Sequence, residues 1–476
     1  IYSKKYSMNI DKVREERQLL GVDRWFNHQC KGILFWATGV GKTYGATLAI
    51  KRIEKQKQPV YLIAVPSFEL KKQWEERLSK VFPKKVTDRI IVETIQTLLF
   101  RNIKYIVDVY IVDEIHEFVS EERIKLLNGT LVEYKAILGL TASADDKNFK
   151  TISNLLPIVD VISDEEAREK GFIAEFIEYN LALSLSGEEL ESYEHYSRII
   201  AETLPKFQND LTLAQFCISG GLDKKSGKYY AAPNWATGYA HKRGWKPNLD
   251  LRLQVNQQIN DLWNPTKIIG YAKKLLNAIR DRKSLLQTCQ SKYEATKKLV
   301  DKFDKVKTIV FSESTEFADN VAKLLETKHK VVVYHSNIKT VIKPSPKTGK
   351  PIKVGKTRLK REATESIRNG KARIIVTAKS LDKGFDVVDL RFGITASGTQ
   401  NPTQYKQRGG RVKRKETEQI FSDCTVLLVN LYIINTQDEK WLKNRQMNAV
   451  HSIINVSSID DISYTPPSNI EFSMDI

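Results

Sequence analysis

The chain has 476 residues, of which 41% are hydrophobic and 28% charged, and this balance is typical of a water-soluble globular protein with two or three domains. No apolar run approaches the ~18 residues that a membrane span requires, and we expect no secretory signal, because residues 1–9 lack an apolar core. The formal net charge is +19, from 76 basic and 57 acidic residues, so we expect a polyanionic partner, most simply nucleic acid. The four cysteines, Cys30, Cys217, Cys289 and Cys424, lie far apart in the sequence, which argues against a disulfide framework or a zinc ribbon. We therefore expect an intracellular, cytoplasmic location.

Residues 32–43 carry the clearest chemical pattern in the chain. The apolar run Gly32–Trp36 leads into a glycine-bearing turn, and the amphipathic stretch Tyr44–Ile53 follows, which together predict a strand, a phosphate-binding loop and a helix. Glycine in the turn lets backbone N–H groups approach phosphate oxygens, and the helix N-terminus adds its positive dipole end. The residues expected to bind ATP here are Thr38, Gly39, Val40, Gly41, Lys42 and Thr43. Trp36 stands where such a loop usually has its first glycine.

Three side chains near this loop have distinct expected roles. Lys42 would reach the β- and γ-phosphates as part of the catalytic apparatus, and the Thr43 hydroxyl would hold Mg²⁺. Gln18, in a polar helical stretch upstream of the loop, could read the edge of adenine, because an amide offers both a donor and an acceptor. A solvated glutamine on a helix surface explains the same residue equally well.

A second polar motif follows an apolar run, and its residues are Asp113-Glu114-Ile115-His116. Residues at the carboxyl end of a buried strand emerge at the edge where α/β sheets bind ligands. We therefore expect Asp113 to hold Mg²⁺, directly or through water, and Glu114 to polarise the attacking water as general base. Thr141-Ala142-Ser143 ends the next apolar run, where hydroxyl groups could either link the nucleotide site to a neighbouring domain or cap a helix.

Short apolar runs alternate with helical segments in both halves of the chain. The runs are Val60–Pro66, Arg89–Thr94, Val109–Glu114 and Ala136–Leu140, then Thr308–Phe311, Val331–Tyr334, Arg373–Val376, Phe392–Thr395 and Thr425–Leu431. This alternation predicts an α/β fold with two parallel-sheet domains in tandem and a helical insertion between them. The expected parts are a first domain over residues 1–180, a helical, basic and aromatic region over 181–300, a second domain over 301–435 and a tail over 436–476.

Two segments combine many basic residues with no acidic ones. Residues 224–249 place Lys242 and Arg243 among tyrosines and tryptophans, which suits nucleic-acid backbone contacts and base stacking as well as it suits a packed helical subdomain. Residues 337–361 contain nine lysines and arginines, and their prolines and glycines predict a loop or hairpin. We expect this insertion to contact DNA rather than to be only a solvated loop, through Lys343, Lys347, Lys350 and Lys353.

The second domain has no phosphate loop of its own, but it contains Gln407-Arg408-Gly409-Gly410-Arg411-Val412-Lys413-Arg414. Arg411 and Arg414 are three positions apart and would share one face of a helix. A basic helix face is a sufficient explanation of this pattern. However, the nucleotide site of the first domain offers no charge-stabilising arginine, so we expect these two residues to act as catalytic arginine fingers across a cleft. Hydrolysis would then require closure of the cleft.

Together these motifs resemble those of the superfamily 2 helicases. The matching segments, in chain order, are Trp36–Thr43, Pro66-Ser67, Thr94–Thr97, Asp113–His116, Thr141–Ser143, Thr377–Asp386 and Gln407–Arg414. The resemblance implies two RecA-like domains with ATP and Mg²⁺ between them and a nucleic-acid strand across both. It also implies nucleotide contacts from Gly384 and Asp386, and strand contacts from Pro66, Ser67, Thr94, Gln96, Ser312, His335 and Thr377. The departures are Trp36, Ile115 in the acidic box and Thr-Ala-Ser for Ser-Ala-Thr, and none removes a catalytic group.

Within that superfamily, the compact size and helical middle are similar to phage branch-migration and recombination helicases, restriction-enzyme motor subunits and RecG-type fork remodellers. The sequence therefore favours an ATP-dependent DNA helicase or translocase acting on branched or duplex DNA, without a membrane partner and in a host cytoplasm if the chain is phage-encoded. Two alternatives stay open. One is an RNA helicase, since gripping a strand by its backbone is common to both kinds of enzyme. The other is a nucleotide-dependent clamp or sensor that binds nucleic acid without unwinding it.

Overall fold

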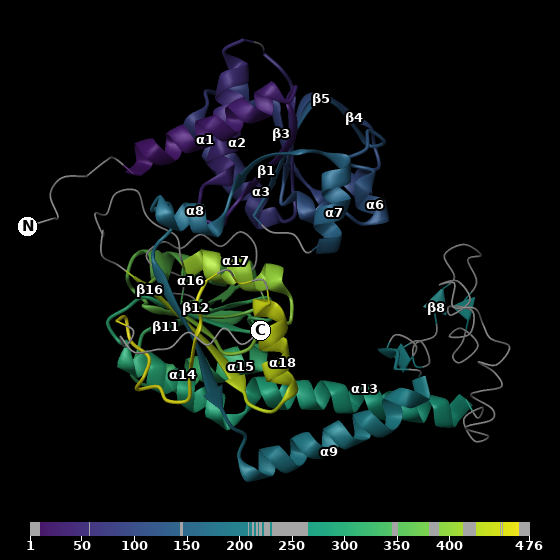
Figure 1. Ribbon diagram of the computed structural model, residues 1–476, viewed down its shortest axis with the longest axis vertical. Coiled ribbons are helices and arrows are strands. Elements are labelled where there is room, and N and C mark those ends of the chain that lie inside the picture. The colour runs from purple at the N-terminus through teal and green to yellow at the C-terminus, as the bar shows by residue number, and fades with distance from the viewer. Residues whose placement is uncertain are drawn as a thin grey trace, which may run out of the picture. The chain divides into compact units, whose positions relative to one another are not determined.

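The computed structural model describes residues 10–56, 58–142, 146–207, 209–211, 214–215, 218, 221–222, 229–230, 265–344, 351–379, 390–412, 425–447, 449 and 451–465. The chain divides into two compact units: residues 1–183 together with 295–476, and residues 184–294. The first unit contains two large parallel sheets, and the second is built mainly of helices (Figure 1).

The first α/β domain is built on six parallel strands. They are β1 (Lys31–Trp36), β2 (Tyr61–Val65), β3 (Ile90–Thr94), β4 (Tyr105–Asp113), β5 (Val132–Thr141) and β6 (Ile158–Ile162). Their order across the sheet is β3-β2-β4-β5-β1-β6. Because the strands are parallel, the segments that follow them all leave the same edge of the sheet. That edge collects the phosphate loop, Ser67, Thr94, Asp113 and Thr141.

Helices cover both faces of this sheet, because its central strands are apolar on both sides. On one face, α1 (Ile10–Asn27), α2 (Lys42–Glu54) and α3 (Phe68–Val81) pack a core that includes Trp25 and Trp74. The other face is covered by α5 (Ile95–Arg101), η1 (Ile115–Phe118) and α7 (Asp146–Leu155). The remaining helices are short: α4 (Lys84–Thr87), α6 (Glu121–Ile124) and α8 (Asp164–Glu169).

The second α/β domain has a sheet of seven parallel strands in the order β11-β14-β10-β15-β16-β7-β17. The strands are β7 (Phe176–Leu183), β10 (Thr308–Ser312), β11 (Val331–His335), β14 (Ile374–Ala378), β15 (Phe392–Thr395), β16 (Val426–Ile433) and β17 (Ile454–Val456). Its helices are α15 (Thr315–Glu326), α16 (Lys356–Arg368), α17 (Pro402–Val412) and α18 (Gln437–Gln446). The predicted fold class, with two parallel-sheet domains in tandem, is confirmed.

The second sheet takes strands from outside the range 301–435 that alternation along the chain predicts. β7 lies N-terminal to the helical insertion and pairs with β16 from Phe176 opposite Val426 to Leu183 opposite Ile433. The expected boundary at residue 180 therefore falls inside a strand. The tail adds β17, which pairs with β7 on its other side. Reading in chain order misses this arrangement, because a strand placed before an insertion looks like the last strand of the preceding domain.

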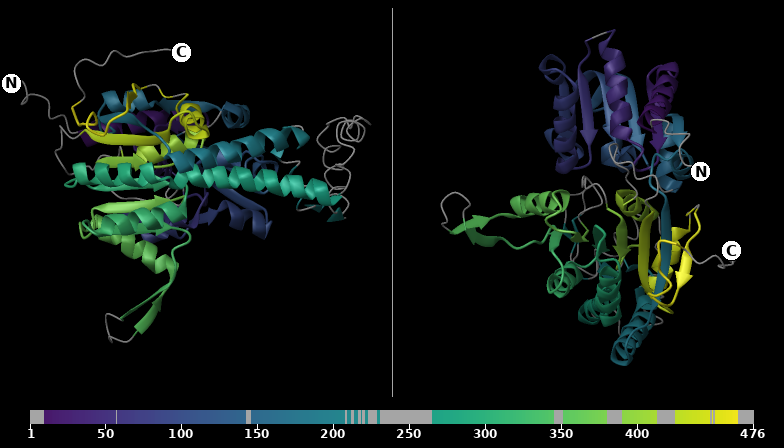
Figure 2. Two further views of the ribbon diagram at one scale, coloured as in Figure 1. Left: turned by 90° about the horizontal axis from the view of Figure 1, so that it is seen from below. Right: turned by 90° about the vertical axis from the view of Figure 1, so that its left-hand side faces the viewer.

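The basic insertion contains a hairpin, as its prolines and glycines predict. β12 (Val341–Pro344) and β13 (Pro351–Val354) pair in antiparallel fashion, and α16 follows directly. Figure 2 shows the hairpin standing away from the sheet of its own domain. Lys343 lies on β12 and Lys353 on β13, where the Lys353 side chain is exposed; Lys347 and Lys350 lie outside the described residues.

The second unit pairs two long helices. α9 (Gly187–Thr203) packs against α13 (Pro265–Thr288) around Ile200, Phe207, Ala272 and Leu275. α9 starts with a capping box, in which Ser186 and Glu189 bond each other's backbone N–H. The remaining elements are η2 (Leu204–Phe207), the short antiparallel strands β8 (Gly221–Leu222) and β9 (Tyr229–Tyr230), and α14 (Gln290–Lys302), which continues into the first unit. Lys242 and Arg243 lie outside the described residues.

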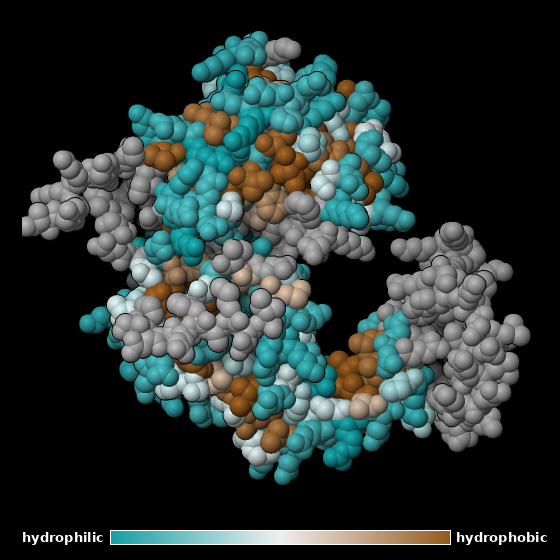
Figure 3. Space-filling view, viewed as in Figure 1, coloured by the Kyte–Doolittle hydropathy of each residue, from teal (hydrophilic) through white to brown (hydrophobic). Residues whose placement is uncertain are grey.

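Hydrophobic side chains on the visible surface lie in separate patches among hydrophilic ones (Figure 3). Among the helices that the structure describes, none combines the length and apolar character needed to cross a lipid bilayer.

Candidate nucleotide site

The phosphate loop joins β1 to α2, and two glycines determine its shape. Gly39 and Gly41 have φ angles of 96° and 97°, in the left-handed region that side chains disfavour. A Cβ at Gly41 would lie 2.7 Å from Nε2 of Gln18, so that position also lacks room for a side chain. α2 begins directly at Lys42 and Thr43, which places its positive dipole end beside the loop. This is the local geometry that a phosphate group requires.

Gln18 supports the loop from α1. Its Nε2 donates to the carbonyl oxygen of Val40 at 2.7 Å and lies 3.5 Å from that of Gly41, and its side chain is buried. The solvated alternative therefore does not describe this residue. A contact between Gln18 and adenine stays a prediction, and the hydrogen bonds show that the same amide holds the loop backbone in place.

Trp36, in place of the usual first glycine, is accommodated by glycines on two helices. A Cβ at Gly21 of α1 would come within 2.5 Å of its Cζ2, and one at Gly45 of α2 within 2.4 Å of its Cζ3. The ring is fully buried, and its Nε1 donates to Asp160 of β6 at 2.6 Å. Arg17 of α1 donates to the same carboxylate at 2.9 Å. The bulky ring thus fixes the start of the loop to α1, α2 and β6.

Asp113 ends β4 as a buried carboxylate. Its Oδ2 accepts from Nε1 of Trp74 at 2.9 Å, and its Oδ1 accepts from the backbone N–H of Glu114 at 3.1 Å. Burial, and then the neighbouring charge of Glu114, raise the pKa of Asp113 to about 6, while the Trp74 hydrogen bond and the charge of Lys42 lower it. Two adjacent carboxylates, one disfavoured in its ionised form, make a site that a divalent cation would stabilise. The residues present therefore fit the expected Mg²⁺.

Glu114 starts the turn after β4 in a left-handed conformation, with φ 51° and ψ 53°. Such angles are uncommon for residues other than glycine, and strained residues of this kind are enriched at functional sites. Oε2 of Glu114 lies 3.5 Å from Nδ1 of His116, and that nitrogen lies 2.9 Å from the Thr141 hydroxyl. The acidic box at the end of β4 is therefore connected to the hydroxyl motif at the end of β5. Ser143 of that motif lies outside the described residues.

The residues expected to contact a nucleic-acid strand from the first domain lie at the carboxyl ends of β2 and β3. Ser67 and Thr94 cap α3 and α5, each accepting a hydrogen bond from the backbone of its helix. Pro66 is buried and Gln96 is exposed. The structure brings these four residues to the edge that also carries Asp113, and their strand contacts stay predictions.

The corresponding residues of the second domain lie at the ends of β10, β11 and β14. Ser312, His335 and Thr377 are all buried. The Ser312 hydroxyl lies 3.2 Å from that of Ser397, and Nε2 of His335 lies 2.9 Å from Oδ1 of Asp319. Ser312 and His335 also accept hydrogen bonds from backbone N–H groups of the loops that follow their strands. A direct contact of the side chains with a strand stays a prediction.

Arg411 lies in the last turn of α17, and the residue before it, Gly410, lies close to the phosphate loop. Within the same compact unit, a Cβ at Gly410 would lie 2.3 Å from Cγ2 of Thr38. The helix that carries Arg411 thus lies beside the loop that carries Lys42, as a finger role requires. Three further predicted nucleotide contacts lie outside the described residues: Gly384, Asp386 and Arg414.

Sequence reasoning gave no role to Arg408, Asp160 or Trp74. Arg408 is buried, pairs with Glu313, and donates through one guanidinium nitrogen to the Ser397 carbonyl oxygen at 3.2 Å. It anchors α17 to the end of β10. The position of Arg408 inside the Gln407–Arg414 motif could have indicated a role for it from the sequence alone. Asp160 and Trp74 give none, because their partners are distant in the sequence.

We predict that Gly45→Ala destabilises the protein by about 1–3 kcal/mol, because the added methyl group would overlap the Trp36 ring. Alanine in a helix interior is otherwise more favourable than glycine by roughly 1 kcal/mol. The matched control is Gly270→Ala in α13, where nothing lies within 4 Å of the new Cβ. Thermal unfolding should show a lower Tm for the first variant and an unchanged or higher Tm for the second. Equal Tm values would contradict the close packing.

We predict that Asp113→Asn raises the free energy of unfolding at pH 8 without nucleotide, by on the order of 1 kcal/mol. The pKa of Asp113 is raised from 3.8 to about 6 on folding, so its ionised form opposes folding. The difference in free energy of unfolding between the variant and the wild type should grow as pH rises from about 4 to about 6 and stay constant above pH 6. Asparagine still accepts from Trp74. The control is Asp108→Asn on the same strand, which removes an ion pair with Lys135 and should not raise the Tm. Thermal unfolding at pH 8 provides the measurement, and a lower Tm for Asp113→Asn than for the wild type would show that ionised Asp113 does not oppose folding.

Comparisons with known proteins agree with this geometry. A family model described as "Type III restriction enzyme, res subunit" matches residues 5–146, and one described as "Helicase conserved C-terminal domain" matches residues 291–416. Over 449 residues the chain is 25% identical to a protein of Sulfurisphaera tokodaii named "DNA 3'-5' translocase XPB2", across 92% of this chain and 85% of that protein.

Solved structures show the same fold. The helicase domain of Hef from Pyrococcus furiosus superposes with a TM-score of 0.51 at 16% identity, across 90% of this chain and 98% of that one. Dbp5 from S. cerevisiae, bound to RNA and ADP BeF3, superposes with a TM-score of 0.53 at 12% identity, across 94% and 90%. One family match falls in each α/β domain, and the matches follow the chain order of the motifs. The chain is therefore similar to helicases and translocases in both of its α/β domains, which indicates an enzyme that hydrolyses ATP.

Proposed function

We propose that this enzyme is an ATP-driven DNA helicase or translocase that acts on branched or duplex DNA, such as recombination or fork intermediates. The observation that carries the proposal is its similarity, across 92% of its length, to a relative named as a DNA 3'-5' translocase. The net charge of +19 and the exposed lysine on the protruding hairpin support a polyanionic partner. As part of this proposal the enzyme moves in the 3'-5' direction, which is the direction in that relative's name.

In this proposal ATP binds with its phosphates along residues 38–43. Lys42 contacts the β- and γ-phosphates, and Thr43 and Asp113 hold Mg²⁺, which when bound neutralises charge on the phosphates. Glu114 orients the attacking water and accepts its proton. Its position directly after Asp113, in a left-handed turn, and the 3.5 Å between its Oε2 and Nδ1 of His116 support this role.

The transition state is completed from the second domain. Arg411, with Arg414, acts on the developing charge of the transferred phosphoryl group, a contribution worth about 10³–10⁵ in rate. Nucleotide turnover is thereby coupled to the approach of the two domains. A nucleic-acid strand bound at the carboxyl edges of both sheets would move when the two domains come together and again when they separate. Base-pair stacking amounts on average to ~1.4 kcal/mol per step, so continued strand separation needs coupled hydrolysis.

The proposal is tested by measuring ATP turnover and strand displacement side by side on Holliday junctions, forks, tailed duplexes, single-stranded DNA and RNA. We expect branched DNA to stimulate turnover most and to be unwound or migrated. Lys42→Ala and Glu114→Gln should each lower turnover by roughly 10²–10⁴ while leaving DNA binding largely intact, because both residues are assigned to the nucleotide and not to the strand. Stimulation by RNA instead of DNA would support an RNA helicase. Hydrolysis without displacement or movement would support a clamp. Either result overturns the proposal.

The hairpin is tested with the triple variant Lys339→Gln, Lys353→Gln, Lys356→Gln. All three lysines are exposed and lie on the hairpin or directly beside it. We expect weaker DNA binding and a salt dependence whose log–log slope falls by up to about 3, because each phosphate contact contributes roughly 0.9. ATP turnover without DNA should not change.

The matched control replaces three exposed lysines of the first domain, Lys55, Lys84 and Lys85, by glutamine. These follow α2 or lie in α4, at the edge of the first sheet opposite the phosphate loop. The control has the same net charge as the hairpin variant but should keep the wild-type salt slope. Equal slopes for the two triple variants would mean that the hairpin is a solvated loop.

A further inference from the structure

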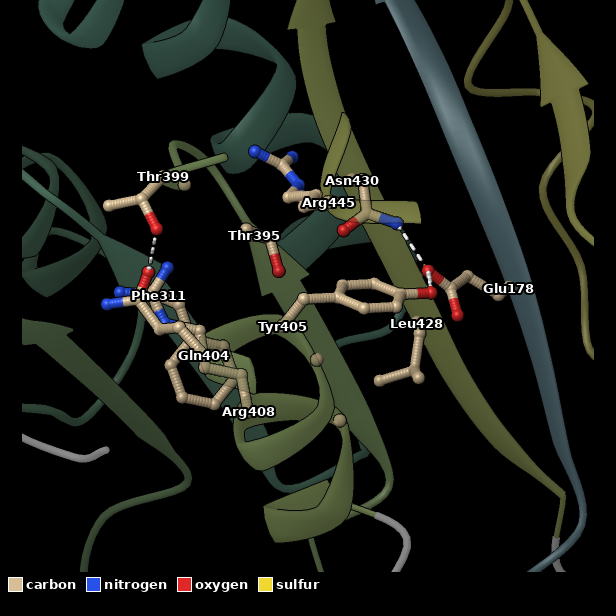
Figure 4. A pocket seen from close by; sticks show the side chains of 13 residues that line it. Glu178, Phe311, Thr395, Thr399, Gln404, Tyr405, Arg408, Leu428, Asn430 and Arg445 are labelled. Atoms are coloured by element: carbon tan, nitrogen blue, oxygen red, sulfur yellow. Dashed lines mark hydrogen bonds between the residues drawn. The ribbon is translucent and has the colours of Figure 1, made fainter. Parts of the chain in front are cut away.

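A buried carboxylate in the second sheet lies directly beneath the helix that carries Arg411. Glu178 of β7 is 2% exposed. Its Oε1 accepts from the Tyr405 hydroxyl at 2.6 Å, from Nδ2 of Asn430 at 2.7 Å and from Nε2 of Gln446 at 3.3 Å, while its Oε2 lies 2.7 Å from Nε2 of His451. Figure 4 shows Tyr405 and Asn430 converging on it. These partners come from α17, β16, α18 and the segment that follows α18, so a single side chain joins four segments.

The strand residues next to Glu178 extend this polar cluster across three strands. Asn180 stands opposite Asn430 of β16 on one side and Asn455 of β17 on the other. Its Nδ2 donates to Oδ1 of Asn455 at 3.0 Å, and its Oδ1 accepts from Nε2 of Gln446 at 2.9 Å. Polar groups buried in a sheet face are unfavourable unless each finds a partner, so this cluster defines one position for the elements that supply the partners.

α17 is held to the sheet at two points. Tyr405, in its first turns, bonds Glu178, and Arg408, one turn further, pairs with Glu313 and the Ser397 carbonyl oxygen. Burial, and then the charge of Glu178, raise the pKa of Tyr405 well above its usual range, so the hydroxyl stays a donor. Two anchors one turn apart fix the rotation of a helix about its axis, and this rotation determines where Arg411 points.

Glu178 also lies on the segment that leaves the first domain. Phe172 is still part of the core of the first domain, where its carbonyl oxygen accepts from Arg14, and β7 starts four residues later at Phe176. Glu178 is the third residue of that strand. A change in the path of the chain between the two domains therefore acts on β7, and Glu178 is the residue of β7 that bonds α17.

We propose that Glu178 and Tyr405 are positioning residues for ATP hydrolysis, which set the direction of Arg411 and connect it to the strand leaving the first domain. The tail takes part, because Gln446 and His451 complete the shell of donors around Glu178. The inference rests on the proposed finger role of Arg411. It adds a function for residues 436–476, for which the sequence offered none.

The test is a double-mutant cycle of Tyr405→Phe and Arg411→Ala, read as kcat and KM for ATP. Tyr405→Phe removes one hydroxyl and leaves Asn430 and Gln446 on the same carboxylate oxygen, so the fold should persist with a Tm close to that of the wild type. We expect kcat to fall roughly ten- to a hundredfold with an unchanged KM, because the phosphate loop is untouched. In the Arg411→Ala background, Tyr405→Phe should cause no further loss.

Tyr179→Phe is the matched control. Tyr179 is the next residue of the same strand, faces the other side of the sheet, and donates to the Ser463 carbonyl oxygen at 3.2 Å. The substitution Tyr179→Phe removes the same kind of hydroxyl as Tyr405→Phe but leaves α17 unchanged, so kcat should not change. His451→Gln, which keeps an N–H donor towards Glu178, should retain more activity than His451→Ala.

The outcomes separate this inference from the function on which it rests. If Arg411→Ala leaves kcat unchanged, the finger assignment is wrong and the inference falls with it. If Arg411→Ala lowers kcat but Tyr405→Phe has no effect, or lowers kcat equally in both backgrounds, the finger assignment stands and the positioning role is refuted. A loss in Tyr179→Phe as large as that in Tyr405→Phe would also refute it, because the effect would then be one of general stability.

Discussion

The nucleotide site depends on a carboxylate that is buried before any ligand binds. Asp113 is held by the indole N–H of Trp74, lies within the electrostatic influence of Lys42, and is followed directly by Glu114. Burial, and then repulsion from the adjacent Glu114, raise the pKa of Asp113. A cation relieves that repulsion, so the fold keeps the site in a state that ligand binding makes more favourable. Parallel strands make this arrangement achievable, since they deliver the phosphate loop and the acids to one edge.

Trp36 shows how an unusual residue at a catalytic loop is tolerated. In many phosphate loops the first position is glycine, and here an indole ring is buried at that place. The ring fits because Gly21 and Gly45 leave a space on the two helices beside it, and because Asp160 accepts its N–H. The groups that would touch phosphate come after this position and keep the usual geometry at Gly39 and Gly41. The change therefore affects how the loop is anchored and leaves its contact surface intact.

Local patterns predicted most of the first domain and the chemistry at its edge. Residues 36–43 and 113–116 are contiguous, so their spacing carries the information, and the structure has a strand, loop and helix where the first pattern predicts them. The basic insertion was predicted as a hairpin because proline and glycine act locally. What could not be predicted depends on pairing between distant segments. β7 is separated from its partner β16 by more than the whole helical insertion, and no local signal distinguishes it from a strand of the first domain.

The same limit explains why the cluster around Glu178 is invisible in the sequence. Its members lie between residues 178 and 455, and each is an ordinary polar residue in its own neighbourhood. Only the register of three strands and the packing of two helices bring them together. A buried carboxylate with four partners tolerates few alternative arrangements, because moving any partner removes a hydrogen bond from a buried charged group. A helix that presents a catalytic arginine needs that kind of restraint, since transition-state contacts are sensitive to displacements of about 1 Å. On the proposed finger role of Arg411, the polar cluster around Glu178 belongs to the hydrolytic apparatus as well as to the sheet.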